Sequence, residues 1–253
     1  TLKVGRQPLQ WFPFLITFEK ISNAYAFVSQ LSRHPSIKPH DLIVYHTELI
    51  RILKAQSNGR LAIGDKNLVL ITFSDQEQSR LFKLYLDEGE IRMADEESAH
   101  FLWEERFLPM SIKHLGPSLL ATEVILPLDQ VADYEEKIGQ WGKRLGITFY
   151  PSSHLINKDQ VLFLAMITSD RRKAIFYIDL MLVPMMVRLA VQFYHGKPYG
   201  LGIWNTPFLR DLYSKEEVKE LVRYKKKVDP QRILNPGKFF TVSGRLGPLQ
   251  KMI

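Results

Sequence analysis

Apolar strand-like runs alternate with amphipathic helix-like runs along this chain, and this order limits the folds open to it. An apolar run at residues 11–18 is followed by a helical pattern from Ser22, and a second apolar run occupies 41–46. The order returns later, with a run at 120–128 and a helical pattern that Gly146 ends. Strand–helix–strand units that occur twice predict an α+β fold. We expect a duplicated ferredoxin-like arrangement, with a mainly antiparallel sheet and helices packed on one face.

No Pro-, Gly- or Ser-rich linker separates the two halves, so they are expected to form one domain. The most apolar stretch, at 174–194, contains Asp179, Pro184 and Arg188. A transmembrane helix carries few or no charges, so a buried amphipathic helix explains this stretch better than a membrane span.

The 253 residues include no cysteine, which excludes disulfides, zinc–thiolate sites, iron–sulfur ligation and cysteine nucleophiles. The formal charge of +7 permits contact with acidic ligands or with an anionic membrane surface. The basic and aromatic strand pattern of RNA-binding sheets is missing, so a nucleic-acid partner is not predicted. We expect a cytoplasmic protein, with peripheral membrane contact as an option.

A more specific pattern lies near the C-terminus. Ser214 and Glu217 form a capping box that starts a helix. The helix leads into Asp229-Pro230 and then into Asn235-Pro236-Gly237-Lys238. This order resembles the end of the FAD-linked oxidase C-terminal domain, which occurs in D-lactate dehydrogenases, glycolate oxidase subunits and D-2-hydroxyglutarate dehydrogenases.

A second motif resembles the same family. Trp103-Glu104-Glu105-Arg106 is similar to its Trp-x-x-Arg segment, and the strand at 122–128 is similar to the acidic-Val-x-x-Pro strand that follows. In the family this arginine pairs with the substrate carboxylate, so the resemblance makes Arg106 a substrate-binding residue. The alternative is an ion pair between Arg106 and Glu104, Glu105 or Glu123.

Some family members carry His-x-Gly-Asp-Gly-Asn-x-His as a metal and acid–base motif. Residues 153–161 occupy its place, and His154 matches the first histidine. The glycines and the second histidine have no counterpart, and one imidazole binds a divalent ion weakly, so no catalytic metal is predicted. His154 remains a candidate general base, and the alternative is an ordinary loop histidine.

A third family motif, Glu-His-Gly-Ile-Gly followed by Pro-Tyr-Leu, resembles residues 198–202 followed by 207–209. In this register Gly200 and Gly202 allow close approach of substrate, and Tyr199 faces the cavity as a catalytic hydrogen-bond donor. Another register places the motif on residues 194–196. The alternative without function is a packed loop with Trp204 buried.

The resemblance implies FAD, yet the sequence lacks Gly-x-Gly-x-x-Gly and a phosphate-binding P-loop. We therefore expect an FAD-binding domain to lie upstream or in a partner subunit. Residues 1–10 would be the tail of that missing domain, 11–240 the substrate-binding cap domain, and 241–253 a C-terminal extension. Asn235 and Lys238 would contact the flavin side, or Asn235 would simply anchor a turn with its side chain.

Taken together, the resemblance predicts the substrate-binding domain of an FAD-dependent oxidoreductase. The substrate would be a hydroxylated, carboxylate-bearing small molecule, and the chain alone would be inactive. The alternative is a non-catalytic binding or scaffold module that retains the fold.

Overall fold

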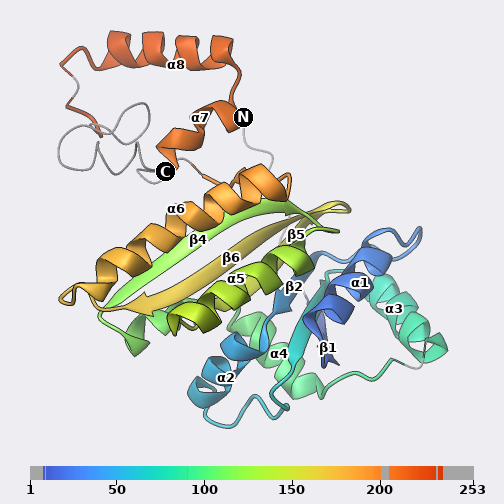
Figure 1. The fold of residues 1–253 in the computed structure, drawn as a ribbon. Helices are drawn as coiled ribbons and strands as arrows, with labels where there is room; N and C mark the ends of the chain where they lie inside the picture. Colours follow the sequence, from blue (N-terminus) through green and yellow to red (C-terminus); the bar gives the residue numbers. More distant parts are fainter. Residues whose placement is uncertain (1–7, 9, 90, 201–204, 232, 236–253) are drawn as a thin grey trace.

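One antiparallel sheet of seven strands forms the centre of the computed structural model, which describes residues 8, 10–89, 91–200, 205–231 and 233–235 (Figure 1). Each neighbouring pair in the order β1-β3-β2-β5-β6-β4-β7 is antiparallel. The strands are β1 (Phe12–Phe18), β2 (Asp41–Tyr45), β3 (Asn67–Phe73), β4 (Ser118–Pro127), β5 (Tyr150–Asn157), β6 (Gln160–Ser169) and β7 (Lys197–Pro198).

The strand order shows the duplication directly. In the first half, α1 (Ile21–Ser32) connects β1 to β2, and α3 (Gln76–Glu88) follows β3. In the second half, α5 (Val131–Leu145) connects β4 to β5, and α6 (Ile175–Phe193) follows β6. The order β1-β3-β2 is thus repeated as β4-β6-β5, and the two copies meet edge to edge.

A fourth strand position is filled in both copies. β7 pairs with β4, and in the first half Met93 forms an isolated bridge to Ile16 of β1. Each half therefore has the 4-1-3-2 strand order of a ferredoxin-like unit. The predicted α+β fold with a mainly antiparallel sheet is confirmed.

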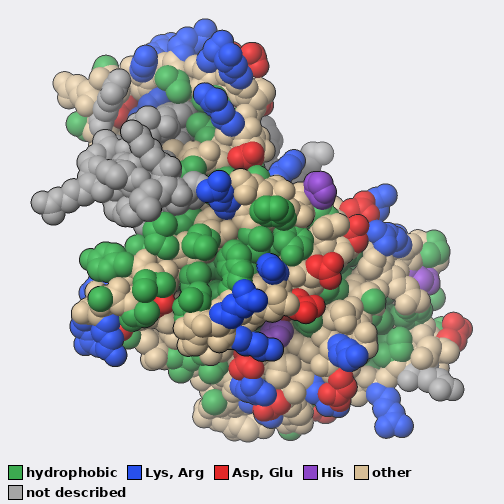
Figure 2. Space-filling model, in the orientation of Figure 1, with side chains coloured by type: hydrophobic (Ala, Val, Ile, Leu, Met, Phe, Trp, Pro, Cys, Tyr) green, Lys and Arg blue, Asp and Glu red, His purple; other side chains and the backbone are tan. Residues whose placement is uncertain are grey.

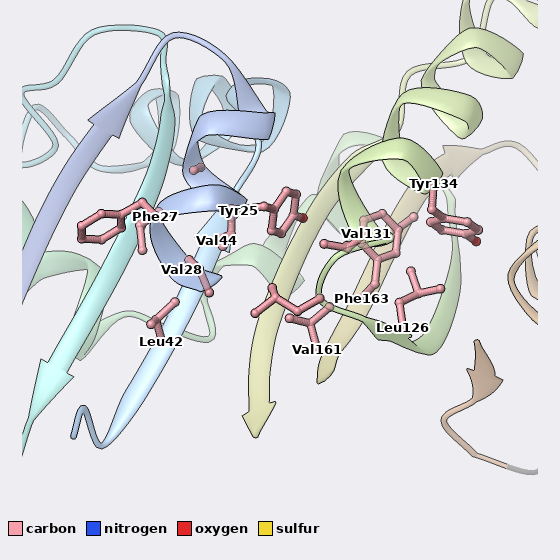
Figure 3. Packing of buried hydrophobic residues seen from close by; sticks show 14 of the residues in the cluster. Tyr25, Phe27, Val28, Leu42, Val44, Leu126, Val131, Tyr134, Val161 and Phe163 are labelled. Atoms are coloured by element: carbon pink, nitrogen blue, oxygen red, sulfur yellow. The ribbon is translucent and has the colours of Figure 1, made fainter. Parts of the chain in front are cut away.

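The two halves join where β2 pairs with β5, and we call this junction the seam. Its pairs are Ile43 with His154, Val44 with Ser153, and Tyr45 with Ser152. On one face of the sheet α1 and α5 lie over the seam, and Tyr25 extends from α1 toward α5 (Figure 3). The Tyr25 hydroxyl donates to Glu135 Oε2 at 2.7 Å and lies 2.8 Å from Ser153 Oγ, so a buried polar cluster links both halves.

Four helices, α1, α3, α5 and α6, pack on one face of the sheet, which we call the helix face. Alternate residues of β4 and β6 point into this core, and Val124, Leu126 and Phe163 are fully buried there. The Tyr134 hydroxyl donates to the carbonyl of Met186 at 3.0 Å, which ties α5 to α6. These four helices fit the expectation of helices on one face.

The other face carries a second helical layer, which covers the first half and reaches the adjoining parts of β4, β5 and β6. It consists of α2 (Thr47–Gln56), α4 (Glu96–Glu104) and the 3₁₀ helix η1 (Leu108–Leu115). The second layer is explained by β3, because all seven of its residues are buried and so both of its faces are covered. A strand that is apolar on both faces needs cover on both sides, so the prediction of one helical face was incomplete.

The C-terminal part extends away from the sheet (Figure 1). It contains η2 (Thr206–Phe208), α7 (Leu209–Leu212) and α8 (Lys215–Val228). The predicted capping box is present, because Ser214 Oγ accepts from the Glu217 amide and Glu217 accepts from the Ser214 amide. No residue of α8 is buried, so this amphipathic helix presents its apolar side outside the core.

Candidate functional site

Part of the second face is left uncovered. On β4, Val124 and Leu126 are 0% exposed toward the helix face, whereas Glu123 before them is exposed and Ile125 between them is half-buried. On β6, Leu162 and Leu164 are likewise half-buried while Phe163 is fully buried. We call this uncovered surface the open patch, and it comprises Ala121, Glu123, Ile125, His154, Leu162 and Leu164.

The strand register places the side chains of this patch in rows across the sheet. One row runs from Ile43 through His154, Leu162 and Ile125 to Lys197. The next row runs from Tyr45 through Ser152, Leu164 and Glu123. Directly opposed residues of an antiparallel pair lie on the same face, so these rows fix the neighbours of each candidate residue.

His154 lies in the middle of β5, between Ile43 of β2 and Leu162 of β6. The alternative of a loop histidine is therefore wrong. The stretch around it has few apolar residues, and its alternation was too weak to predict a strand beyond Tyr150. Burial lowers the pKa of His154, and the negative charge of Asp41 opposes this effect. The imidazole is thus neutral near pH 7 and able to accept a proton.

Arg106 follows α4 and lies at the end of the same face. Its guanidinium donates to the carbonyl of Trp103 at 3.0 Å and stacks 4.7 Å from the centre of the Trp103 ring and 5.0 Å from that of Phe107. Burial raises the pKa of the Tyr45 hydroxyl, and the positive charge of Arg106 acts against that rise, which puts Arg106 near the Tyr45 row. Among the described contacts Arg106 has no ion pair with Glu104, Glu105 or Glu123, so that alternative is not formed.

Tyr199 lies at the opposite edge of the patch. Its amide donates to the carbonyl of Glu123 at 3.2 Å and extends the β4–β7 pairing by one residue, and its side chain is 53% exposed. Three strand spacings separate β5 from β7, which is about 14 Å. His154 and Tyr199 thus border the same surface, but they are too far apart to act on one proton.

The remaining predicted residues fall outside the patch or outside the described chain. The carbonyl of Gly200 accepts from the Asn205 side chain at 2.6 Å, and the space around its α-carbon is open. Asn235 has a positive φ of 45° beyond α8. The turn before it is anchored by Asp229, whose carboxylate accepts from the amides of Ile233 and Leu234. Gly202 and Lys238 lie outside the described residues.

One neighbour of His154 was not identified from the sequence. Asp41 begins β2 and lies on the same face as His154, because Ile43 two residues later pairs with His154. Only the pairing of β2 with β5 reveals this proximity. Within the described residues there is no group of three or more His, Asp or Glu side chains suited to a metal ion.

Comparison with known proteins identifies the family of the chain. The model for FAD linked oxidases, C-terminal domain, matches residues 14–239. No curated protein sequence matches the chain significantly. Among solved structures, 4-ethylphenol oxidase from Gulosibacter chungangensis in an isoeugenol complex has a TM-score of 0.69 at 15% identity, over 95% of this chain and 55% of that one.

Two further structures share the fold. p-Cresol methylhydroxylase with substrate bound has a TM-score of 0.70 at 13% identity, over 94% of this chain and 54% of that one. Alkyldihydroxyacetonephosphate synthase has a TM-score of 0.59 at 14% identity, over 90% of this chain and 45% of that one. The chain thus spans about half the length of these proteins, and identities this low show the fold alone. The match of the family model over residues 14–239 establishes that the chain belongs to the FAD-linked oxidase C-terminal domain family.

Proposed function

We propose that the open patch is the substrate-side wall of a flavin active site, which an FAD-binding domain completes. The observation that carries this proposal is the open patch with His154 inside it. Ile125, Leu162 and Leu164 are only half-buried in this patch, and covering them with a partner is favourable because removal of apolar surface from water is stabilising. The first two proteins of this fold named above are about twice as long as the chain, so each has enough further residues for a second domain.

The patch is better suited to contact the flat ring of the cofactor than to bind its pyrophosphate. It is a sheet surface of aliphatic side chains with an imidazole among them, and such a surface suits a flat ring system and a bound substrate. It offers no glycine-rich turn at a helix N-terminus, which a pyrophosphate requires. We therefore assign most FAD contacts to the other domain, with Asn235 and Lys238 as candidate contacts from this chain. A bound flavin supplies the hydride acceptor for oxidation of the substrate.

The residues of this chain then have separate tasks. His154 accepts the proton of a substrate hydroxyl, since its imidazole is neutral near pH 7. Arg106 binds the substrate carboxylate with the N–H groups that its contact to Trp103 leaves available. Leu162 and Leu164 exclude water from the surface between them. Tyr199, with Gly200 and Gly202, borders the far edge, where a phenol hydroxyl can donate to a longer substrate.

The second candidate function is a non-catalytic binding module of the same fold. The missing second histidine and the missing Gly-Asp-Gly-Asn favour it. The two functions differ in one property, because only the enzyme reduces its flavin when substrate is added.

The test uses the full-length protein, purified with its flavin, and records the visible spectrum before and after addition of 2-hydroxy acids. Alkylphenols belong in the same panel, since two proteins of this fold are named for phenols. Bleaching of the flavin band by a compound supports the enzyme. A flavin that no compound of the panel reduces, or protein that binds no flavin, favours the binding module.

Once a substrate reduces the flavin, point variants test the assigned tasks. His154→Asn should slow flavin reduction about 100-fold or more, since general-base catalysis contributes that much. Arg106→Ala should raise the KM for an acid far more than for an uncharged substrate. His114→Asn and Arg80→Ala replace exposed residues outside the patch and serve as matched controls. Equal rates for His154→Asn and His114→Asn would contradict the role of His154.

A further inference from the structure

The outer side of α6 is apolar where a surface helix is normally polar. Its inner side packs on the sheet, with Met186, Val187 and Ala190 almost fully buried. On the outer side Ile178, Met181, Met185 and Leu189 follow one another at spacings of three or four residues, which places them in one stripe. Ile178 is 53% exposed and Met185 46%, and Tyr177 and Phe193 extend the surface at the two ends. We call these six residues the α6 stripe.

The charge at the start of the stripe is mainly basic. Asp179 is the one acidic residue in the sequence of α6, and it is 5% exposed and accepts a hydrogen bond from Ser169. Arg171, Arg172 and Lys173 precede the helix and are exposed, and Arg172 pairs with Asp170 at 2.8 Å. Figure 2 shows hydrophobic side chains gathered over α6. The surface is therefore apolar along the helix and mainly basic at its N-terminal end.

The helix lies along the sheet and is held there. The Thr122 hydroxyl donates to the carbonyl of Val183 at 3.3 Å, and the Tyr134 hydroxyl donates to the carbonyl of Met186. By length and hydropathy α6 is the one described helix that resembles a membrane span, but this is weak evidence, and its inner side is part of the core. Crossing a bilayer would require these core contacts to break, whereas lying flat on one would not.

We propose that the α6 stripe is a docking surface for an anionic lipid membrane. The aliphatic and aromatic side chains enter the boundary between headgroups and acyl chains, and the arginines and lysines contact lipid phosphates. Charge complementarity supports this occupant, because the chain carries +7 and Arg171 and Lys173 are exposed basic residues at the start of the helix. The surface lies on the helix face, opposite the open patch, so both can be occupied together and the proposal does not depend on the flavin site.

A second copy of the chain is the less suitable occupant. Only four of the six side chains are exposed by about half or more, and a stable interface removes about 800 Å² from each partner, so the stripe alone is small for a dimer interface. Two copies would also bring basic groups together, which like-charge repulsion disfavours.

The test measures co-sedimentation of the full-length protein with vesicles of phosphatidylcholine, either alone or with about 30% phosphatidylglycerol. Binding is expected to the anionic vesicles, and it should weaken as salt is added. Ile178→Glu combined with Met185→Glu should lower the partition coefficient about tenfold or more, since both residues would leave the lipid. Leu84→Glu is the matched control, because Leu84 is 59% exposed on α3 and distant from the stripe.

A second pair of variants separates the charges from the stripe. Arg171→Glu with Lys173→Glu should weaken binding to anionic vesicles several-fold more than Lys226→Glu with Lys227→Glu, which changes the net charge equally on α8. Circular dichroism and the unfolding midpoint verify that each variant is folded. The proposal is overturned if the wild type does not bind anionic vesicles. It is also overturned if Lys226→Glu with Lys227→Glu loses as much binding as Arg171→Glu with Lys173→Glu. A dimer of the wild type in light scattering likewise overturns it, if Met185→Glu dissociates this dimer while the variant still binds vesicles as the wild type does.

Discussion

His154 owes its chemistry to two opposing neighbours. Ile43 and Leu162 flank it in the sheet and remove water from the imidazole, which lowers its pKa. Asp41 on the same face favours the charged form and limits that effect. Asp41 thus influences through its charge how readily His154 accepts a proton.

Replacement of Asp41 tests this balance. Asp41→Asn should lower the pKa of His154 further, because the substitution removes a negative charge and leaves the burial unchanged. An NMR titration of the imidazole carbon-bound protons measures the shift. Asp87→Asn, at an exposed site on α3, is the control and should leave the pKa unchanged. An unaltered pKa in Asp41→Asn would show that the carboxylate does not influence the imidazole.

Some candidate site residues could be identified from the sequence, and another was missed for a physical reason. His154 and Arg106 belong to short motifs that resemble those of the family, so they could be proposed from the sequence. Asp41 becomes a neighbour of His154 only through the register of β2 against β5, and Ile43 is 111 positions from His154 in the chain. No local pattern encodes a pairing over that distance.

At the scale of elements, α5 shows how one helix end is fixed. Gly146 ends it in the left-handed conformation with φ of 67°, as the sequence predicted. A side chain at Gly142 would place its β-carbon 2.5 Å from the carbonyl oxygen of Ile147 and 2.9 Å from the ring of Phe149. Gly142 therefore permits close packing of the helix end on the segment that leads into β5. Gly139 in the same helix has open space around it.

The two glycines of α5 give a matched pair of substitutions. Gly142→Ala should lower the free energy of unfolding by about 1 to 3 kcal/mol, since the methyl group overlaps backbone and ring atoms. Gly139→Ala should raise it by about 0.5 to 1 kcal/mol, because alanine is the better helix former. Urea unfolding measures both. Similar effects from the two substitutions would show that the close approach at Gly142 is relieved without cost.

The elements also show the limits of local prediction. The capping box of α8 lies in one short segment and was predicted correctly. Asp75, and not Ser74, caps α3 by accepting from the Gln78 amide, because both residues suit that position and only the backbone path decides between them. The residue before α5 is Gln130, and it makes no side-chain cap.

At the scale of the whole molecule, a buried polar cluster spans the seam. Glu135 of α5 accepts from Tyr25 of α1 at 2.7 Å, and its second oxygen lies 3.9 Å from His46 Nε2 and has no hydrogen-bond partner in the structure. Ser153 of β5 completes the cluster through Tyr25. Burial raises the pKa of Glu135 to about 7, and the hydrogen bond from Tyr25 acts in the opposite direction.

This cluster makes stability depend on pH. The protonated form of Glu135 is favoured in the folded state, so its contribution to stability is fully present below the unfolded pKa of about 4.5 and is lost as pH rises through about 7. From pH 5 to pH 8 the free energy of unfolding of the wild type should therefore fall by roughly 2 kcal/mol because of Glu135. Glu135→Gln removes this titration, so the variant should not show that fall. Urea unfolding at both pH values measures the difference. Burial lowers the pKa of His46, which gives the opposite pH dependence, but that contribution is present in both proteins and cancels in the comparison. Parallel pH profiles for the two proteins would contradict the raised pKa.

The seam also sets an order for biosynthesis. Each half of the sheet is built from one continuous part of the chain, with β1, β2 and β3 ending at residue 73 and β4 beginning at 118. During translation the first half emerges and can pair its strands before the second half exists, whereas the seam must wait until β5 has been made. His154 and Glu135 both belong to this last junction. A nascent or truncated chain can thus hold native secondary structure with Asp41 and Arg106 present but His154 missing, so the complete site reports that folding of the whole domain is complete.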